Sequence, residues 1–172
     1  FSELRESAAW VEKYLAEDGD GNQIADYAKE NGVTICLENM PMLKFSMGKP
    51  EAIARFIEEM NDEYFQGCLD TGHAHIFRDV TMKSAVECMG KHIKVIHAHD
   101  NMFNRDLHLY PLVYGNTDWA ELGEALRTVG FDGIFELELN PPTRLPDHLY
   151  NEHARLIRKI GGRLVDMMGY EL

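Results

Sequence analysis

The sequence repeats one unit four times: a helical segment, then a short apolar run with the composition of a strand buried on both faces. The strands are expected near 33–39, 65–70, 93–99 and 133–139. The helices are expected at 7–15, 22–31, 50–61, 82–89, 119–128 and 148–168, and the last could be interrupted at Gly161 and Gly162. Strands that alternate with helices at this spacing predict right-handed βαβ crossovers and a parallel sheet in an α/β fold.

Each predicted strand carries an acidic residue or a histidine at, or just before, its C-terminal end. Parallel strands end at one common edge of the sheet, where α/β barrels and open α/β sheets build their sites. Residues two positions apart in a strand share a face. The pairs that share a face here are Cys36 and Glu38, Cys68 and Asp70, His97 and His99, and Glu136 and Glu138. The strands are therefore expected to bring four side chains to one point: Glu38, Asp70, His97 and Glu138.

Such a cluster calls for a cation, because three carboxylates cannot stay ionised within a few ångström of one another without compensating charge. Three oxygen ligands and one nitrogen ligand suit Mn²⁺, Mg²⁺ or Co²⁺, and Zn²⁺ is also compatible. Taken singly, an acid at a strand end is usually solvated and a strand histidine usually packs. Their occurrence in all four strands favours a divalent metal site.

Two loop segments supply further candidates. His73 follows Asp70 by three residues, where it could reach a substrate or a second metal ion, or lie in a solvated turn. Asp106 and His108 have the spacing of a metal-binding pair on an extended loop. These three residues are predicted to bind the substrate or a second metal ion.

Charge and cysteine usage limit the partners and the compartment. The 17 Lys and Arg residues against 29 Asp and Glu residues give a formal charge of −12, which repels nucleic acid and anionic membranes. The three cysteines have no CxxC spacing, as in reduced cytosolic proteins, and Cys36 and Cys68 are interpreted as interior packing. The chain has neither a run of 18 apolar residues nor the features of a signal peptide, so a cytoplasmic protein is expected.

Six motifs, in this order, resemble the sugar phosphate isomerase/epimerase family, over roughly residues 24 to 140. They are Cys36-Leu-Glu-Asn39, Cys68-Leu-Asp-Thr-Gly-His73, Ile96-His-Ala-His-Asp-Asn101, Asp106-Leu-His108, Gly115-Asn-Thr-Asp-Trp119 and Phe135-Glu-Leu-Glu138. The fold of that family is the xylose isomerase-like TIM barrel, which it shares with metal-dependent apurinic endonucleases. The resemblance implies that this chain forms part of such a barrel.

The resemblance also implies residue roles. It places the metal ion on the four strand-end residues and makes Glu38 and Glu138 the acid/base pair. It matches His73 to a histidine that contacts substrate, and Asp106 and His108 to a pair that holds an additional metal ion in the endonuclease branch. Glu136 and His99 are weaker site candidates, and Glu138 is preferred to Glu136 because it lies nearer the rim.

Length sets this chain apart from a complete barrel, which needs about 250 residues and eight strands. The 172 residues are expected to form one domain, residues 1–172, that holds about the last four βα units. Either the chain is a fragment, or two copies associate as a homodimer that completes the barrel. The leading function is a metal-dependent isomerase or epimerase that acts on a sugar or polyol. The alternatives are an apurinic-endonuclease-like hydrolase, against which the −12 charge argues, and an inactive half-barrel assembly module.

Overall fold

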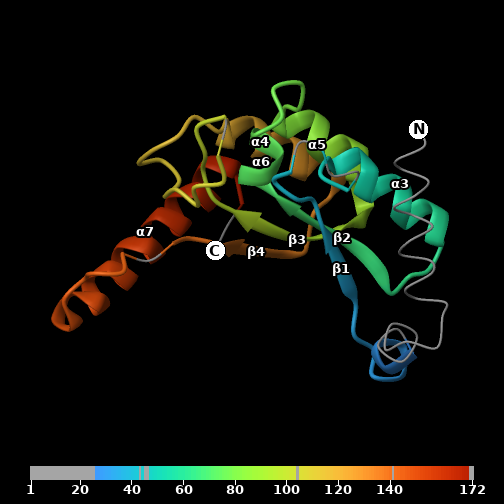
Figure 1. The fold of residues 1–172 in the computed structure, drawn as a ribbon, viewed down its shortest axis with the longest axis horizontal. Helices are drawn as coiled ribbons and strands as arrows, with labels where there is room; N and C mark the ends of the chain where they lie inside the picture. The colour runs from blue at the N-terminus through green and yellow to red at the C-terminus, as the bar shows by residue number, and fades with distance from the viewer. Residues whose placement is uncertain (1–25, 43, 45–46, 104, 141, 171–172) are drawn as a thin grey trace.

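The computed structural model describes residues 26–42, 44, 47–103, 105–140 and 142–170. Its centre is a four-stranded sheet in which every neighbouring pair is parallel and the strand order follows the sequence (Figure 1). The strands are β1 (Ile35–Glu38), β2 (Phe65–Asp70), β3 (Ile93–Ala98) and β4 (Ile134–Leu137). The predicted parallel α/β arrangement is therefore confirmed.

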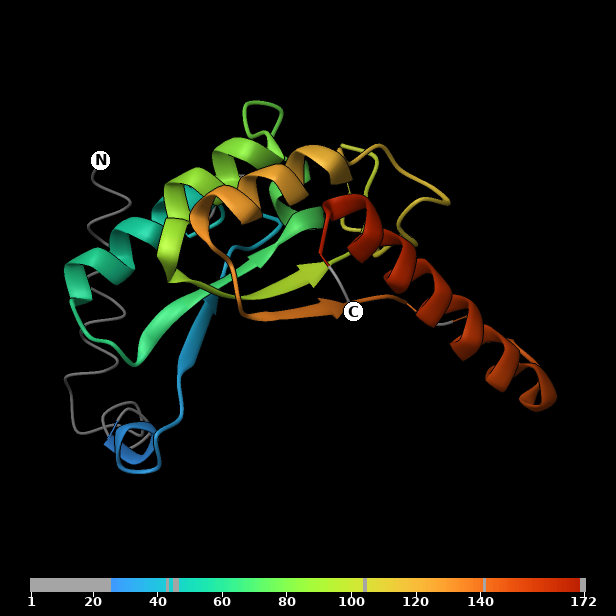
Figure 2. The same ribbon diagram turned by 180° about the vertical axis from the view of Figure 1, so that it is seen from behind.

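Three helices connect the strands and cover one face of the sheet: α3 (Pro50–Met60), α5 (Met82–Met89) and α6 (Trp119–Val129) (Figure 2). A longer helix, α7 (Tyr150–Met168), follows β4. Its N-terminal part extends away from the sheet in both views, whereas Ile160, Leu164 and Met168 nearer its C-terminal end are buried in the core. The chain also forms the short helix α4 (Thr71–His75) and the 3-10 turns η1 (Gly90–His92) and η2 (Asp147–Leu149).

Most helix predictions within the described residues hold, and the differences concern the last helix and α4. The last helix begins at Tyr150 after the η2 turn, and it runs through Gly161 and Gly162 without interruption. Helix α4 was not expected, because its five residues are too few to show a periodic pattern. Residues 26–30 of the predicted helix 22–31 are helical, whereas the helix predicted at 7–15 lies outside the described residues.

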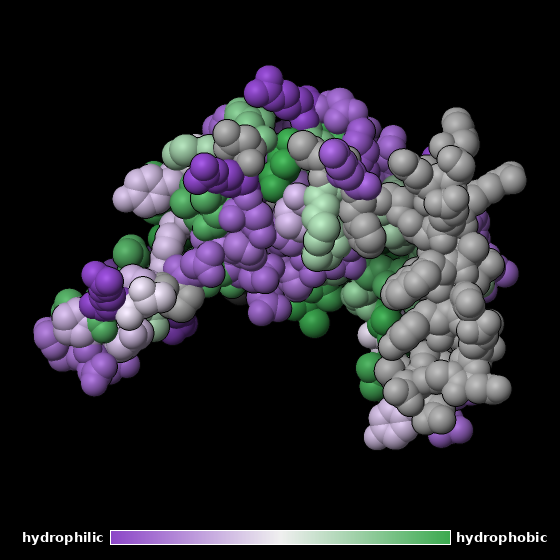
Figure 3. Space-filling view, viewed as in Figure 1, coloured by the Kyte–Doolittle hydropathy of each residue, from purple (hydrophilic) through white to green (hydrophobic). Residues whose placement is uncertain are grey.

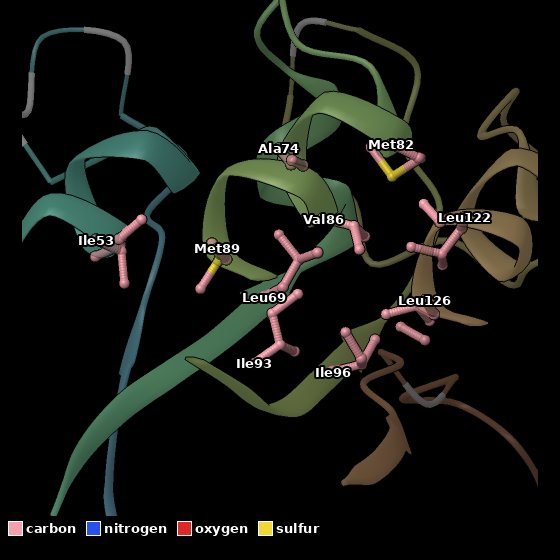
Figure 4. Close-up of a cluster of buried hydrophobic side chains, with 14 of the residues drawn as sticks. Ile53, Leu69, Ala74, Met82, Val86, Met89, Ile93, Ile96, Leu122 and Leu126 are labelled. Atoms are coloured by element: carbon pink, nitrogen blue, oxygen red, sulfur yellow. The ribbon is translucent and has the colours of Figure 1, made fainter. Parts of the chain in front are cut away.

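The core lies between the sheet and its covering helices (Figure 4). Leu69 of β2 and Ile96 of β3 are fully buried there, against side chains that include Val86 of α5 and Leu122 and Leu126 of α6. Burying one such aliphatic side chain contributes about 1.5–3 kcal/mol. Because strand side chains alternate, fixing Leu69 and Ile96 on the helix side turns their neighbours toward the opposite face.

No helix in the described part of the chain covers that opposite face of the sheet (Figure 2). Ile134 is 63% exposed and Val33 is 53% exposed, and hydrophobic surface remains visible along the lower side of the molecule (Figure 3). The four strands thus form an open sheet, whereas a closed TIM barrel needs eight strands. None of the helices within the described ranges is long and apolar enough to cross a membrane.

Candidate metal centre

The C-terminal ends of the four strands bring the predicted ligands together. Asp70 of β2 lies opposite His97 of β3 in the sheet register. Glu138 directly follows β4, and its backbone N–H donates to the carbonyl of Ala98 at 3.2 Å. Each of the four predicted ligands offers one atom, and these atoms all lie within 4.8 Å of one another: Glu38, Asp70, His97 and Glu138.

An irregularity in the sheet helps to aim these side chains. Between Gly67 and Cys68 the register of β2 against β3 shifts, so that Lys94 is an extra residue on β3. The extra residue lets both Ile93 and Ile96 enter the helix-side core, although they are three positions apart. His97 then lies on the opposite face, with Asp70. Bulges of this kind often re-aim a side chain beside an active site.

Two polar atoms at the centre of the group lie against each other but form no hydrogen bond with the described residues. His97 Nδ1 lies 3.1 Å from Glu138 Oε2 and 3.6 Å from Glu38 Oε1. Both His97 Nδ1 and Glu138 Oε2 are shielded from solvent and form no hydrogen bond within the described residues. An unpaired buried polar atom costs about 1–3 kcal/mol. A divalent cation bound between the two atoms would satisfy both, so this donor set fits a metal ion.

Proton affinities in the group reflect its concentrated negative charge. Burial, together with the charge of Asp70, raises the pKa of the Glu138 carboxyl above its ordinary value. Burial alone would lower the pKa of His73, but the hydrogen bond with Glu38 and the charge of Asp70 raise it to about 9. In both cases a proton supplies positive charge that a metal ion would also supply.

A second group lies beside the first. It consists of four side chains whose ligand atoms lie within 4.8 Å of one another: His73, His99, Asp106 and His108. The Asp106 carboxylate is 3.4 Å from His73 Nε2 and 3.2 Å from His108 Nε2. The Nδ1 atom of His108 is 3.1 Å from the carbonyl oxygen of Glu138, which orients the ring with Nε2 toward Asp106. The loop pair predicted from the sequence therefore meets His73 in space, and His99 joins it.

His99 also links the two groups. Its Nε2 lies 3.0 Å from Oδ2 of Asp70, and both side chains are fully buried. Burial alone would raise the pKa of Asp70, but the hydrogen bond and charge of His99 outweigh it and hold the pKa below its ordinary value. A Cβ atom at Gly72 would lie only 2.0 Å from the His99 ring, so glycine is required for the ring to fit.

Three buried polar residues that support the site were not identified from the sequence. The Asn39 side chain donates to the carbonyl of Asp70 at 3.1 Å and accepts from its N–H at 2.8 Å, which ties the ends of β1 and β2 together. Asp100 accepts five hydrogen bonds, including one from the Trp119 indole, and Asn101 accepts from the Leu107 N–H at 2.7 Å. These residues hold the loop that carries Asp106 and His108. Their position just after a strand end was the available signal.

Of two further residues near the strand ends, Glu136 lies apart from the ligand groups and Cys68 lies beside them. Glu136 lies opposite His97 in the register, but it is exposed and belongs to neither group of four. The geometry thus brings Glu138, rather than Glu136, to the other ligands. Cys68 is buried, and its sulfur lies within 4.8 Å of ligand atoms of Glu38 and His97.

Comparison with known sequences gives a family match over most of the chain. The family model described as xylose isomerase-like TIM barrel matches residues 20–160. Two proteins of Methanocaldococcus jannaschii are similar, the uncharacterized proteins MJ1311 and MJ1188. The first is 30% identical over 132 residues, which is 73% of this chain and 45% of that protein. The second is 30% identical over 115 residues, which is 67% of this chain and 40% of that protein. The chain therefore spans less than half the length of these relatives.

Solved structures with a similar fold are also longer than this chain. A D-tagatose 3-epimerase-like protein aligns with a TM-score of 0.68 at 25% identity, over 86% of this chain and 52% of its own. An L-ribulose 3-epimerase aligns with a TM-score of 0.66 at 20% identity, over 96% of this chain and 54% of its own. The IolI protein with a binding zinc atom aligns with a TM-score of 0.66 at 22% identity, over 85% of this chain and 52% of its own. The chain thus spans about half of each of these structures.

Proposed function

The chain belongs to the xylose isomerase-like TIM barrel family, and we propose that its metal centre serves the isomerisation or epimerisation of a sugar, sugar phosphate or polyol. The parallel α/β sheet is part of the barrel fold of that family. The observation that carries the proposal is the meeting of four ligand side chains from the four strand ends, with two solvent-shielded atoms that form no hydrogen bond among the described residues. Mn²⁺, Mg²⁺, Co²⁺ or Zn²⁺ would be held by Glu38, Asp70, His97 and Glu138.

Proton transfer falls to the two glutamates. A bound divalent ion supplies positive charge that polarises substrate oxygens and stabilises the negative charge that develops on them. One glutamate takes the proton from the carbon next to the substrate carbonyl, and the other returns a proton to the opposite face. Glu38 ends β1 and Glu138 follows β4, so their carboxylates approach His97 from the two edge strands of the sheet.

His73 is proposed to contact the substrate. It is 5% exposed, and its Nδ1 lies 2.8 Å from the Asn39 carbonyl oxygen, which fixes the ring. Its other ring nitrogen, Nε2, lies 3.4 Å from Asp106 and is the atom proposed to hydrogen-bond a substrate oxygen.

A hydrolase related to the apurinic endonucleases is the second candidate. The observation that favours it is the His73, Asp106 and His108 cluster, which could hold a second metal ion. The formal charge of −12 disfavours a nucleic acid substrate, because that field repels a phosphate backbone. Cleavage of an abasic-site duplex by the metal-loaded chain would favour the hydrolase.

The isomerase proposal is tested by carbon-bound hydrogen exchange. The metal-loaded chain is incubated in D₂O with a panel of ketoses, and NMR follows deuterium at the carbon next to the carbonyl. We expect metal-dependent deuterium incorporation that a chelator abolishes. One equivalent of bound metal without exchange into any sugar would argue against the isomerase, and absence of bound metal would favour the inactive assembly module.

A further inference from the structure

Cys68 lies at the floor of the proposed metal centre, on the side of the sheet opposite the hydrophobic core. It is 3% exposed, and its neighbour Leu69 points into the helix-side core and is fully buried. Because strand side chains alternate, the Cys68 side chain faces the site side. In the sheet register Cys68 lies directly beside Glu38, and it precedes Asp70 by two residues. A role in packing the hydrophobic core therefore does not account for its position.

The Cys68 sulfur belongs to a third group of potential ligands. Its sulfur, a carboxylate oxygen of Glu38 and a ring nitrogen of His97 all lie within 4.8 Å of one another. Two donors bound to one tetrahedral zinc ion, at about 2.0 and 2.3 Å, are about 3.5 Å apart. Closing the group around an ion thus requires movements of about 1 Å. Glu38 and His97 are shared with the oxygen-rich group, so the two sets of donors surround neighbouring positions.

Asp70, the ligand one layer above Cys68, is already engaged by the protein. Its carboxylate accepts from the His73 N–H at 2.6 Å and lies 3.0 Å from His99 Nε2. These contacts occupy lone pairs of both oxygens and hold the carboxylate in place. His97 Nδ1, in contrast, has no hydrogen-bond partner within the described residues. An ion drawn toward His97 and Glu38 would therefore lie within reach of the sulfur below.

We propose that Cys68 is a metal ligand, and that with Glu38 and His97 it forms a sulfur-containing binding site for Zn²⁺ or Co²⁺ at the floor of the metal centre. The inference rests on the metal centre of the proposed function and specifies its metal class. As the sulfur–metal bond forms, the thiol releases its proton to solvent. A thiolate favours borderline and soft ions, whereas Mg²⁺ and Mn²⁺ prefer oxygen ligands. The sulfur ligand would make the metal centre bind Mg²⁺ and Mn²⁺ less tightly than Zn²⁺ or Co²⁺.

Cobalt spectroscopy tests the sulfur ligand directly. The chain is loaded with Co²⁺, which gives a near-ultraviolet charge-transfer band only when a thiolate is bound. Cys36→Ser is the matched control, because Cys36 lies on β1 with the same spacing before Glu38 but belongs to none of the ligand groups among the described residues. The band is expected in the parent and in Cys36→Ser, and it is expected to disappear in Cys68→Ser while visible Co²⁺ bands remain.

A second variant assigns the band without changing Cys68. The sequence has three cysteines, so the double variant Cys36→Ser with Cys88→Ser leaves Cys68 as the only thiol. We expect this variant to keep the band even if Cys68→Ser does not fold. Removing an outer partner of a metal ligand costs about 10- to 100-fold in affinity. Cys68→Ser is thus expected to lower Co²⁺ affinity at least about 10-fold and to change Mn²⁺ affinity little.

Three outcomes would overturn the inference. Stoichiometric Co²⁺ without the band would show that only the oxygen and nitrogen ligands bind, which leaves the proposed function intact. A band that persists in folded Cys68→Ser, or that is lost in the double variant, would assign it to another thiol. Failure of the parent to bind Co²⁺, Zn²⁺ or Mn²⁺ would refute both the sulfur-containing binding site and the proposed metal-dependent function.

Discussion

Replacing Glu138 by glutamine tests the acid/base assignment with little change of shape. The amide cannot take a proton from carbon, and it replaces an anionic ligand by a neutral one. In the structure Glu138 Oε2 lies 3.1 Å from His97 Nδ1 and has no hydrogen-bond partner among the described residues. The side chain is 42% exposed, so the substitution should leave the core intact.

The expected defect combines two losses. General acid/base assistance contributes about 10²- to 10⁴-fold in rate, or roughly 3–5 kcal/mol in the barrier. Weaker metal binding adds to this at subsaturating metal, by a factor of about 10 to 100 if the loss resembles that of an outer ligand partner. We therefore expect Glu138→Gln to lower the rate of deuterium exchange about 10²- to 10⁴-fold at saturating metal. The free energy of unfolding is expected to stay close to that of the parent.

Glu136→Gln is the matched control for this experiment. Glu136 lies on β4, two residues before Glu138 and on the same face, and the substitution makes the same change in net charge. It is exposed and belongs to neither group of four ligands, so near-parental exchange and metal affinity are expected. Exchange rates are measured by NMR and metal affinity by titration, both at matched metal saturation.

The two variants separate the competing assignments. An inactive Glu136→Gln variant together with an active Glu138→Gln variant would assign the acid/base role to Glu136 instead of Glu138. Parental activity in both would refute proton transfer by the last strand. A parent chain that binds metal but exchanges no substrate hydrogen would favour the half-barrel module.

Three further predictions concern stability and association. Asp100→Asn should lower the free energy of unfolding, measured by urea titration, by about 1.5–3 kcal/mol, because Asp100 is buried and accepts five hydrogen bonds. Asp118→Asn is the control: it changes an exposed helix N-cap to another good N-cap residue and should change the free energy of unfolding little. The pKa of His73 in the folded protein is raised from 6.5 to about 9, so its stabilising contribution to the metal-free chain is complete below about pH 6.5 and is lost as pH rises through about 9. Thermal unfolding across this window should show that loss, and His73→Gln should flatten it. Finally, the chain should self-associate when measured by light scattering, because hydrophobic side chains are exposed on the uncovered face of the sheet. Ile134→Lys should reduce the association, since Ile134 is 63% exposed on that face. A monomeric parent at micromolar concentration would show that the exposed face does not drive association.

Much of the fold could be predicted because each strand is short, apolar and bounded by helices. The observed bounds of β2 are those predicted, and the bounds of the other strands fall within the predicted runs. The meeting of Asp70 and His97 followed from one rule, that parallel strands end at a common edge. That rule needs no knowledge of loop conformation.

The parts that could not be predicted depend on irregular geometry. The bulge at Lys94 breaks the two-residue alternation that the sequence argument assumed, yet it is what lets Ile93 and Ile96 share the core. The loop after β3 is held by Asp100, whose five hydrogen bonds come from four residues spread from Asn101 to Trp119 along the chain. Such contacts join residues with no periodic relation, so no local pattern reports them.

All residues proposed to hold the metal ion come from the four strands and loops of this chain, whereas the face of the sheet below them is uncovered by described helices. Metal binding therefore depends on contacts that the chain makes within itself, such as the Asp70–His99 pair and the Asn39 bridge. Substrate binding requires a pocket wall on the open side, since small ligands are usually buried over most of their surface. Metal affinity and turnover are thus separable measurements, and a chain that binds metal tightly but turns over substrate only when associated would place the missing wall in a partner or in a second copy.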